Sequence, residues 1–173
     1  MGLDYGFMNS VERADFFVWN FHTLDSVEEM NEDLADVWVS CEYPRFVAPY
    51  EIWTGIFKRV GFCSDVDGLT LDDMDEEITI YRSAPTEYAD GMSWTTSLET
   101  AEWFNNRNHL FERTSSKVYK VTIPKSEILG VFEERKEKEI VVSYETAKKY
   151  GATIVEVTPN PDALRGTKTI SEL

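Results

Sequence analysis

Apolar residues recur at helical spacing in two stretches of the first half of the chain. One stripe covers residues 27–38, and Ser26 stands before it as a candidate N-cap. The other covers residues 52–60, with Pro49 suited to position N1 of the helix and Gly61 to its end. We predict a helix for each stripe, with its apolar face in the core.

The first 24 residues are rich in aromatic side chains but have no clear period. Phe16, Phe17, Trp19 and Phe21 lie close together in the sequence. Both a strand and a buried helix are compatible with this run, and the pattern alone does not choose between them.

From residue 78 onward the pattern changes to short strands with one longer helix, which begins after Ser97 as N-cap. The predicted strands are 78–82, 93–95, 119–123, 140–142 and 153–158. Residues 64–77 and 132–139 are charge-dense and are interpreted as loops, and residues 159–173 as irregular. We therefore predict an α+β fold with a helical part, 1–77, and a strand-based part, 78–173, packed as one unit.

Acidic residues outnumber basic residues by 32 to 17 over the 173 residues, which gives a formal charge of −15. A nucleic-acid surface needs a basic patch to displace counterions, so this charge argues against binding DNA or RNA. It favours solubility, or a protein partner with a basic face. The 42% of hydrophobic residues is enough to build a core.

Cysteine and histidine usage predicts neither a disulfide nor a metal site. Cys41 and Cys63 lack CxxC spacing and are expected to be free thiols in a reducing compartment. His22 and His109 have no second ligand at metal-binding spacing. No signal peptide and no apolar run long enough for a bilayer is visible. We expect a soluble cytoplasmic protein, acting in its own cell or in a host cell, with its oligomeric state left open.

Three groups of polar residues stand at or near the ends of predicted strands. Arg82 ends a strand whose period of two aligns it with two isoleucines, so its guanidinium is expected to point inward or into a cleft. Glu137 and Glu139 share one face at the start of another strand. The third group is a row of hydroxyls at a strand–helix junction: Ser93, Thr95 and Ser97. Each group alone also fits a plainer interpretation: a paired strand-end arginine, a solvated charge run or a well-capped helix.

In their order along the chain, these three groups resemble the ADP-ribosyltransferase family, specifically its arginine–serine–glutamate branch. That branch includes clostridial-type toxins and arginine-modifying ectoenzymes, and the small size resembles phage or bacterial members. The resemblance covers roughly residues 78–142 and includes the strand-then-proline segment 118–124. It implies two small antiparallel sheets around a cleft for NAD, which is a substrate, with no metal.

The resemblance also implies roles for individual residues. Glu139 would stabilise a cationic transition state at the ribose of NAD, and Glu137 would orient an acceptor arginine. Arg82 would hold the pyrophosphate or the neighbouring ribose. Thr95 would hydrogen-bond Glu139, although Thr-Thr-Ser replaces the family's Ser-Thr-Ser, so Ser93 or Ser97 is an alternative equivalent.

Two aromatic residues complete the candidate site. Phe104 would flank the nicotinamide, with core packing as the alternative. Phe132 would act in target recognition from an exposed loop, although it lies further from Glu137 than the family pattern requires. The implied function is mono-ADP-ribosylation of a protein target, with arginine as the candidate acceptor. The alternatives are NAD hydrolysis without an acceptor, and a non-catalytic acidic protein that binds a basic partner.

Overall fold

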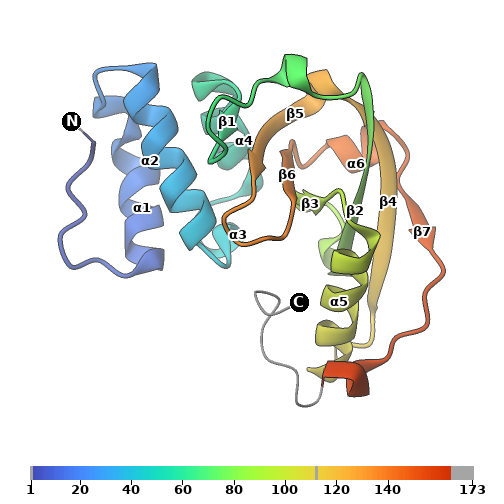
Figure 1. Ribbon diagram of the computed structural model, residues 1–173. Coiled ribbons are helices and arrows are strands. Elements are labelled where there is room, and N and C mark those ends of the chain that lie inside the picture. Colours follow the sequence, from blue (N-terminus) through green and yellow to red (C-terminus); the bar gives the residue numbers. More distant parts are fainter. Residues whose placement is uncertain (1, 112, 165–173) are drawn as a thin grey trace.

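The chain forms a helical N-terminal part beside a mixed β-sheet (Figure 1). The computed structural model describes residues 2–111 and 113–164. Its α-helices are α1 (Ser10–Asn20), α2 (Val27–Ser40), α3 (Pro44–Val47), α4 (Tyr50–Val60), α5 (Leu98–Leu110) and α6 (Thr146–Lys149). Its short 3₁₀ turns are η1 (Phe21–Thr23), η2 (Leu71–Asp73), η3 (Thr86–Tyr88), η4 (Lys125–Glu127) and η5 (Pro161–Leu164). The strands are β1 (Cys63–Ser64), β2 (Glu77–Pro85), β3 (Ser93–Thr95), β4 (Ser116–Pro124), β5 (Ile128–Phe132), β6 (Glu139–Val142) and β7 (Thr153–Val155).

The aromatic N-terminal run is a helix, α1, and the strand alternative is wrong. Asn9 is the N-cap of this helix, because its side chain accepts hydrogen bonds from the backbone N–H groups of Val11 and Glu12. The Glu12 carboxylate accepts in return from the backbone N–H of Asn9, at 2.9 Å, which completes a capping box. Only one side of α1 is buried, through Ala14 and Phe17.

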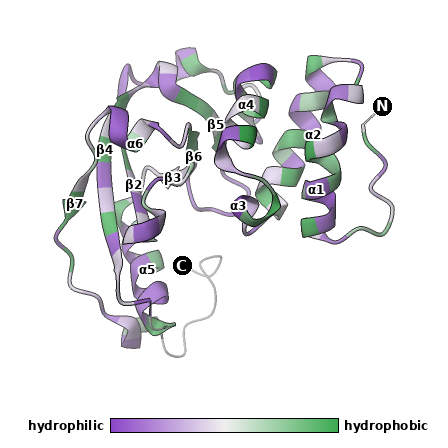
Figure 2. Cartoon of the chain, turned by 180° about the vertical axis from the view of Figure 1, so that it is seen from behind, coloured by the Kyte–Doolittle hydropathy of each residue, from purple (hydrophilic) through white to green (hydrophobic). Residues whose placement is uncertain are grey.

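Both predicted amphipathic helices are confirmed as α2 and α4. The Ser26 hydroxyl accepts a hydrogen bond from the backbone N–H of Glu29, and α4 ends at Gly61, which has a φ of 88°. Pro49 is the N-cap of α4 and not its N1 residue, so that placement is wrong by one position. Figure 2 shows hydrophobic and hydrophilic residues mixed along α1 and α2, and a largely hydrophobic β5. The two predicted stripes are buried except at their first members, Val27 and Ile52, which are exposed.

The strands form one seven-stranded sheet in the order β1-β5-β6-β3-β2-β4-β7, so the expectation of two small antiparallel sheets is wrong. The cause is β3, which pairs with β6 over three residues and with β2 through the single pair Tyr81↔Thr95. This short strand joins the two halves that the sequence predicted as separate sheets. All neighbours are antiparallel except β1 and β5, and β1 enters the sheet from the N-terminal part.

Two apolar cores lie on opposite sides of β6. Val141 packs with the helical part in one core, whereas Ile140 and Val142 belong to the other, which β2, β3 and β4 also line. The alternation of a strand therefore turns Glu139, which shares the parity of Val141, toward the helical part. This geometry sets the position of the candidate site.

The remaining predictions for the chain have mixed outcomes. The segment 64–77 is largely irregular, but it contains η2, the last residue of β1 and the first residue of β2. Of the segment predicted to be irregular, residues 161–164 form η5, and residues 165–173 lie outside the described residues. Both cysteines are free and buried. Among the described residues, no helix combines the length and the apolar character needed to cross a bilayer.

Ser97 is the N-cap of α5, as predicted, and its hydroxyl accepts a hydrogen bond from the backbone N–H of Thr100 at 3.2 Å. Ser97→Ala removes this acceptor and is expected to lower the free energy of unfolding by about 1 kcal/mol. Urea denaturation measures the change. Ser97→Asp, which restores an acceptor, should stay close to the wild type; equal losses in both variants would contradict the capping role.

Candidate active site

Three neighbouring strands bring Arg82, Ser93 and Glu139 together at one small cavity. Arg82 lies on β2, Ser93 begins β3 and Glu139 begins β6, and these strands are adjacent in the sheet. The cavity has a volume of about 120 Å³. Its other lining residues are Tyr81, Ser83, Trp94, Thr95, Ala101, Phe104 and Glu137. The fold thus assembles six of the eight site residues predicted from the sequence, all but Ser97 and Phe132.

The Glu139 side chain is buried and hydrogen-bonded. Only 7% of the residue is exposed, and its Oε1 accepts a hydrogen bond from the Trp38 indole N–H at 3.0 Å. Burial raises the pKa of Glu139 above its ordinary value of 4.5. Hydrogen bonds from Ser93 and Trp38, and the positive charges of Arg135 and Arg82, act in the opposite direction and favour the carboxylate. Glu139 is therefore a desolvated acid whose charge is supported from several sides.

Arg82 holds the backbone around β3 with its guanidinium. Its Nη1 donates to the Ser93 carbonyl at 2.7 Å and its Nη2 donates to the Tyr88 carbonyl at 3.2 Å. Its Nε is buried and has no hydrogen-bond partner. Burial lowers the pKa of Arg82, while Tyr50, Asp90 and Glu139 raise it. The inward orientation is confirmed, and the structure adds a structural role; contact with a pyrophosphate stays a prediction.

Gly91 leaves the space that the Arg82 guanidinium occupies. A Cβ built on Gly91 would overlap the guanidinium itself, so any larger residue would force Arg82 out of its place. Gly91 also has its carbonyl bound by the Trp94 indole N–H at 2.8 Å. This glycine thus allows an arginine and a tryptophan to pack against the same short segment.

The hydroxyl residues at the strand–helix junction differ in their hydrogen-bond partners. Ser93, and not Thr95, hydrogen-bonds Glu139, so the expected Thr95–Glu139 contact is wrong. The Thr95 hydroxyl donates to the Glu137 carbonyl at 2.7 Å and accepts from the backbone N–H of Ser97 at 3.0 Å. Thr95 therefore fixes the strand–helix junction to the segment that carries Glu137.

Glu137 lies in a loop with a constrained backbone. Its neighbours Lys136 and Lys138 have φ values of 55° and 49°, which are unfavourable for residues with a Cβ. The Asp65 carboxylate accepts from the backbone N–H of Glu133 at 2.9 Å and so fixes the start of the loop. These contacts hold a strained segment in place at the edge of the cavity.

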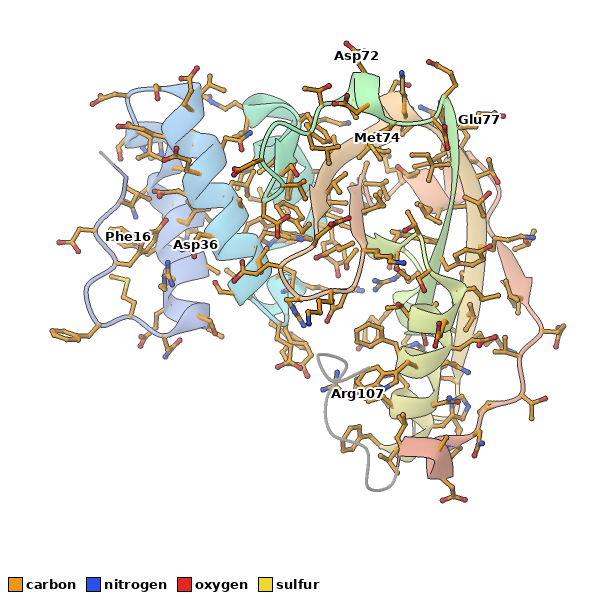
Figure 3. The ribbon with its side chains drawn as sticks, in the orientation of Figure 1. Phe16, Asp36, Asp72, Met74, Glu77 and Arg107 are labelled. Carbon is orange, nitrogen blue, oxygen red and sulfur yellow. The ribbon has the colours of Figure 1, made fainter. Side chains whose placement is uncertain are left out.

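The Glu137 carboxylate is partly buried and paired. It forms an ion pair with Arg135 at 3.2 Å, and 15% of its side chain is exposed. Burial raises the pKa of Glu137, Arg135 lowers it and Glu139 raises it further. Arg107 of α5 also acts on this carboxylate; Figure 3 shows Arg107 on the side of α5 that faces the helical part. Glu137 is therefore not part of a freely solvated charge run.

The two predicted aromatic site residues have different outcomes. Phe104 of α5 lines the cavity. Phe132 ends β5 and is only 2% exposed, so the prediction that it lies in an exposed loop is wrong. Phe132 pairs in register with Glu139 and packs in the core of the helical part, because the strand continues two residues beyond the glycine at 130.

Trp38 is the site residue that the sequence analysis missed. The sequence places Trp38 in a helical apolar stripe, and it does pack there, edge-on against Trp53 and Phe57. A buried tryptophan needs an acceptor for its indole N–H, which is a signal that the sequence contains. The identity of the acceptor, 101 residues away, is decided by the tertiary structure alone.

The arrangement suits chemistry that develops positive charge in a small cavity. A carboxylate held by preorganised donors stabilises a cation without having to reorient. In the ranges that the structure describes, no three His, Cys, Asp or Glu side chains are grouped to hold a metal ion.

Gly91→Ala is expected to displace Arg82 and to lower the free energy of unfolding by about 1–3 kcal/mol, because the Ser93 and Tyr88 carbonyls lose a donor. Gly55→Ala in α4 is the matched control, since a Cβ there meets no atom within 4 Å. It should stabilise the helix by about 0.5–1 kcal/mol. Thermal or urea unfolding of both variants measures the difference, and a Gly91→Ala variant as stable as the wild type would refute the close packing.

Comparison with known proteins adds no family assignment to this geometry. The chain matches no protein-family model, no curated protein and no solved structure at a significant level. The function is therefore inferred from the residues and their arrangement.

Proposed function

We propose that the chain is an NAD-dependent mono-ADP-ribosyltransferase that modifies a protein target, with arginine as the candidate acceptor. The observation that carries the proposal is the convergence of Arg82, Ser93 and Glu139 on one cavity. The sequence resemblance required these residue types in this chain order. The α+β architecture with one mixed sheet is compatible with the proposal, and we extend it to an ADP-ribosyltransferase-like fold.

The proposed reaction breaks the bond between nicotinamide and ribose, and nicotinamide leaves with the electron pair. The ribose carbon becomes electron-poor, and the ADP-ribose group is transferred through this carbon to a nitrogen of the acceptor or to water. The Glu139 carboxylate, which is only 7% exposed, would stabilise this positive charge next to the ribose hydroxyls. Ser93 and Trp38 would keep the carboxylate in place, and Glu137 would accept the proton or orient the acceptor.

The size of the cavity limits how NAD would bind. At about 120 Å³ it is well below the roughly 300–1,000 Å³ of pockets that enclose drug-sized ligands. Only the nicotinamide–ribose end would therefore enter it, next to Phe104 and Glu139. The phosphates and the adenosine would lie outside the cavity, and Arg82 is the cationic residue among those that line it.

A second candidate function has its own observation. An open groove of about 680 Å³ lies between the N-terminal segment and α1, remote from the cavity, and Figure 3 places Phe16 in this region. Its charged lining residues are all acidic, and its aromatic residues include the exposed Phe7 and Trp19. This surface favours the alternative of a non-catalytic protein that binds a basic partner. Nicotinamide release from NAD by the purified chain distinguishes the two functions, because a non-catalytic binding protein releases none.

Glu139→Gln is expected to reduce nicotinamide release by about 10²–10³-fold, because the charge that stabilises the transition state is removed. The same variant should be more stable than the wild type at neutral pH. Since burial raises the pKa of Glu139, the native state holds a proton more firmly than the unfolded state, and the wild type loses stability as pH rises above about 4.5.

Chromatographic measurement of nicotinamide and urea denaturation at pH 4 and pH 7.5 test both effects. The gain in stability should be present at pH 7.5 and small at pH 4, where the glutamate is largely protonated in both states. A variant that keeps most of its nicotinamide release would refute the role of Glu139. No release by the wild type would refute the transferase and favour the binding protein.

Glu137→Ala is expected to separate transfer from hydrolysis. Transfer to agmatine, a small guanidinium acceptor, should fall about 10²-fold because no group is left to orient the acceptor, whereas NAD hydrolysis changes little because water still enters. Glu137→Gln, which keeps the side-chain volume, is the control for the packing of the loop. Equal loss of both activities would instead assign Glu137 to the NAD site, and undiminished transfer would exclude arginine as the acceptor.

A further inference from the structure

The C-terminal end of α2 contacts Glu139 of the candidate site directly and reaches Glu137 through Arg135. Trp38, which is 3% exposed, donates its indole N–H to Glu139 Oε1 at 3.0 Å. One residue further, the Val39 carbonyl accepts from Arg135 Nη1 at 3.4 Å, and Arg135 Nη2 pairs with Glu137 at 3.2 Å. Figure 1 shows the β5–β6 loop reaching this end of α2.

The core of the helical part fixes the direction of the Trp38 indole. Its ring contacts Trp53 and Phe57 edge-on, with centroid distances of 5.5 and 5.0 Å. Rotation of the Trp38 ring would break this packing, so the N–H can point only toward Glu139.

The choice of a carboxylate as acceptor is not explained by packing alone. Trp53 and Trp94 are equally buried, and both satisfy their indole N–H groups with backbone carbonyls, those of Pro44 and Gly91. A carboxylate in the same environment must be desolvated, which is unfavourable for stability. An interaction that opposes stability is more readily explained by a function for the charged group it holds.

We infer that Trp38 is a positioning residue that fixes the Glu139 carboxylate for catalysis, and that the helical part is thereby a component of the active site. The catalytic consequence rests on the proposed function. The contact itself does not, because it is a property of the folded chain.

The groups that face Glu139 determine how its pKa changes when the Trp38 hydrogen bond is lost. They are Trp38 from α2, Arg82 from β2, Ser93 from β3, and Arg135 and Glu137 from the β5–β6 loop. Burial raises the pKa of Glu139, and the Trp38 hydrogen bond is one of the interactions that lower it. Without this donor the ionised form is less favoured, so the pKa rises further.

The test compares Trp38→Phe with Trp53→Phe. Both variants keep an aromatic ring in the same cluster and both lose an indole N–H, but only the first deprives Glu139 of a donor. The titration of Glu139 is followed by carbon NMR of protein labelled at glutamate carboxyls, with the signal assigned through Glu139→Gln. The pH dependence of nicotinamide release is measured in parallel.

In Trp38→Phe we expect the Glu139 titration to move to higher pH and the acidic limb of the rate profile to move with it. We also expect kcat to fall about tenfold with little change in KM, because an interaction that matters in the transition state is lost. In Trp53→Phe we expect the Glu139 titration and the rate profile of the wild type, with a loss of stability only.

An unchanged Glu139 titration in Trp38→Phe would overturn the inference, whatever the activity. A wild type that releases no nicotinamide but shows the shifted titration would refute the proposed function and leave the positioning contact standing. If Trp38→Phe does not fold, benzothienylalanine at position 38 replaces it, because sulfur substitutes for the N–H while the bicyclic shape is kept. The same titration then decides the question.

Discussion

The burial of the Glu139 carboxylate is the constraint on which the rest of the site depends. A charge removed from water must be met by donors and opposite charges, and here they come from four separate segments. Trp38 reaches Glu139 from the helical part, Ser93 from the neighbouring strand, Arg82 from the strand beyond it, and Arg135 from the adjoining loop. The helical part, two strands and one loop therefore meet at Glu139, because its buried carboxylate needs the donors and positive charges that they supply.

The short strand β3 makes this convergence geometrically possible. It joins β6 to β2 and so places the site at the seam between two groups of strands. Only one residue pair connects β3 to β2, so the backbone pairing between these two strands is weak. Arg82 strengthens the connection by donating hydrogen bonds to the Ser93 and Tyr88 carbonyls. Gly91 gives the guanidinium the space for these bonds. The same arginine thus stabilises the seam and supplies positive charge near Glu139.

The loop between β5 and β6 shows how a charge-dense segment becomes ordered. Its positive φ values at Lys136 and Lys138 are unfavourable, and they persist because backbone contacts surround them. Asp65 binds the start of the loop, and Thr95 binds the Glu137 carbonyl. A strained backbone that neighbouring contacts keep in place is typical of functional sites. Here the strained conformation sets the orientation of the backbone at Glu137.

The sequence by itself determined the parts of the molecule that depend on local interactions. The helices after Ser26 and Ser97 follow from caps and apolar spacing, and the strands from alternation, because both are set by residues a few positions apart. The resemblance also selected Arg82 and Glu139, which the fold brings to one cavity.

Only the tertiary structure decided that the strands form a single sheet, that Ser93 rather than Thr95 binds Glu139, and that Phe132 is buried. It also decided that Trp38 belongs to the site. Each of these outcomes depends on contacts between residues distant in the sequence, and such pairings are not encoded in any local period.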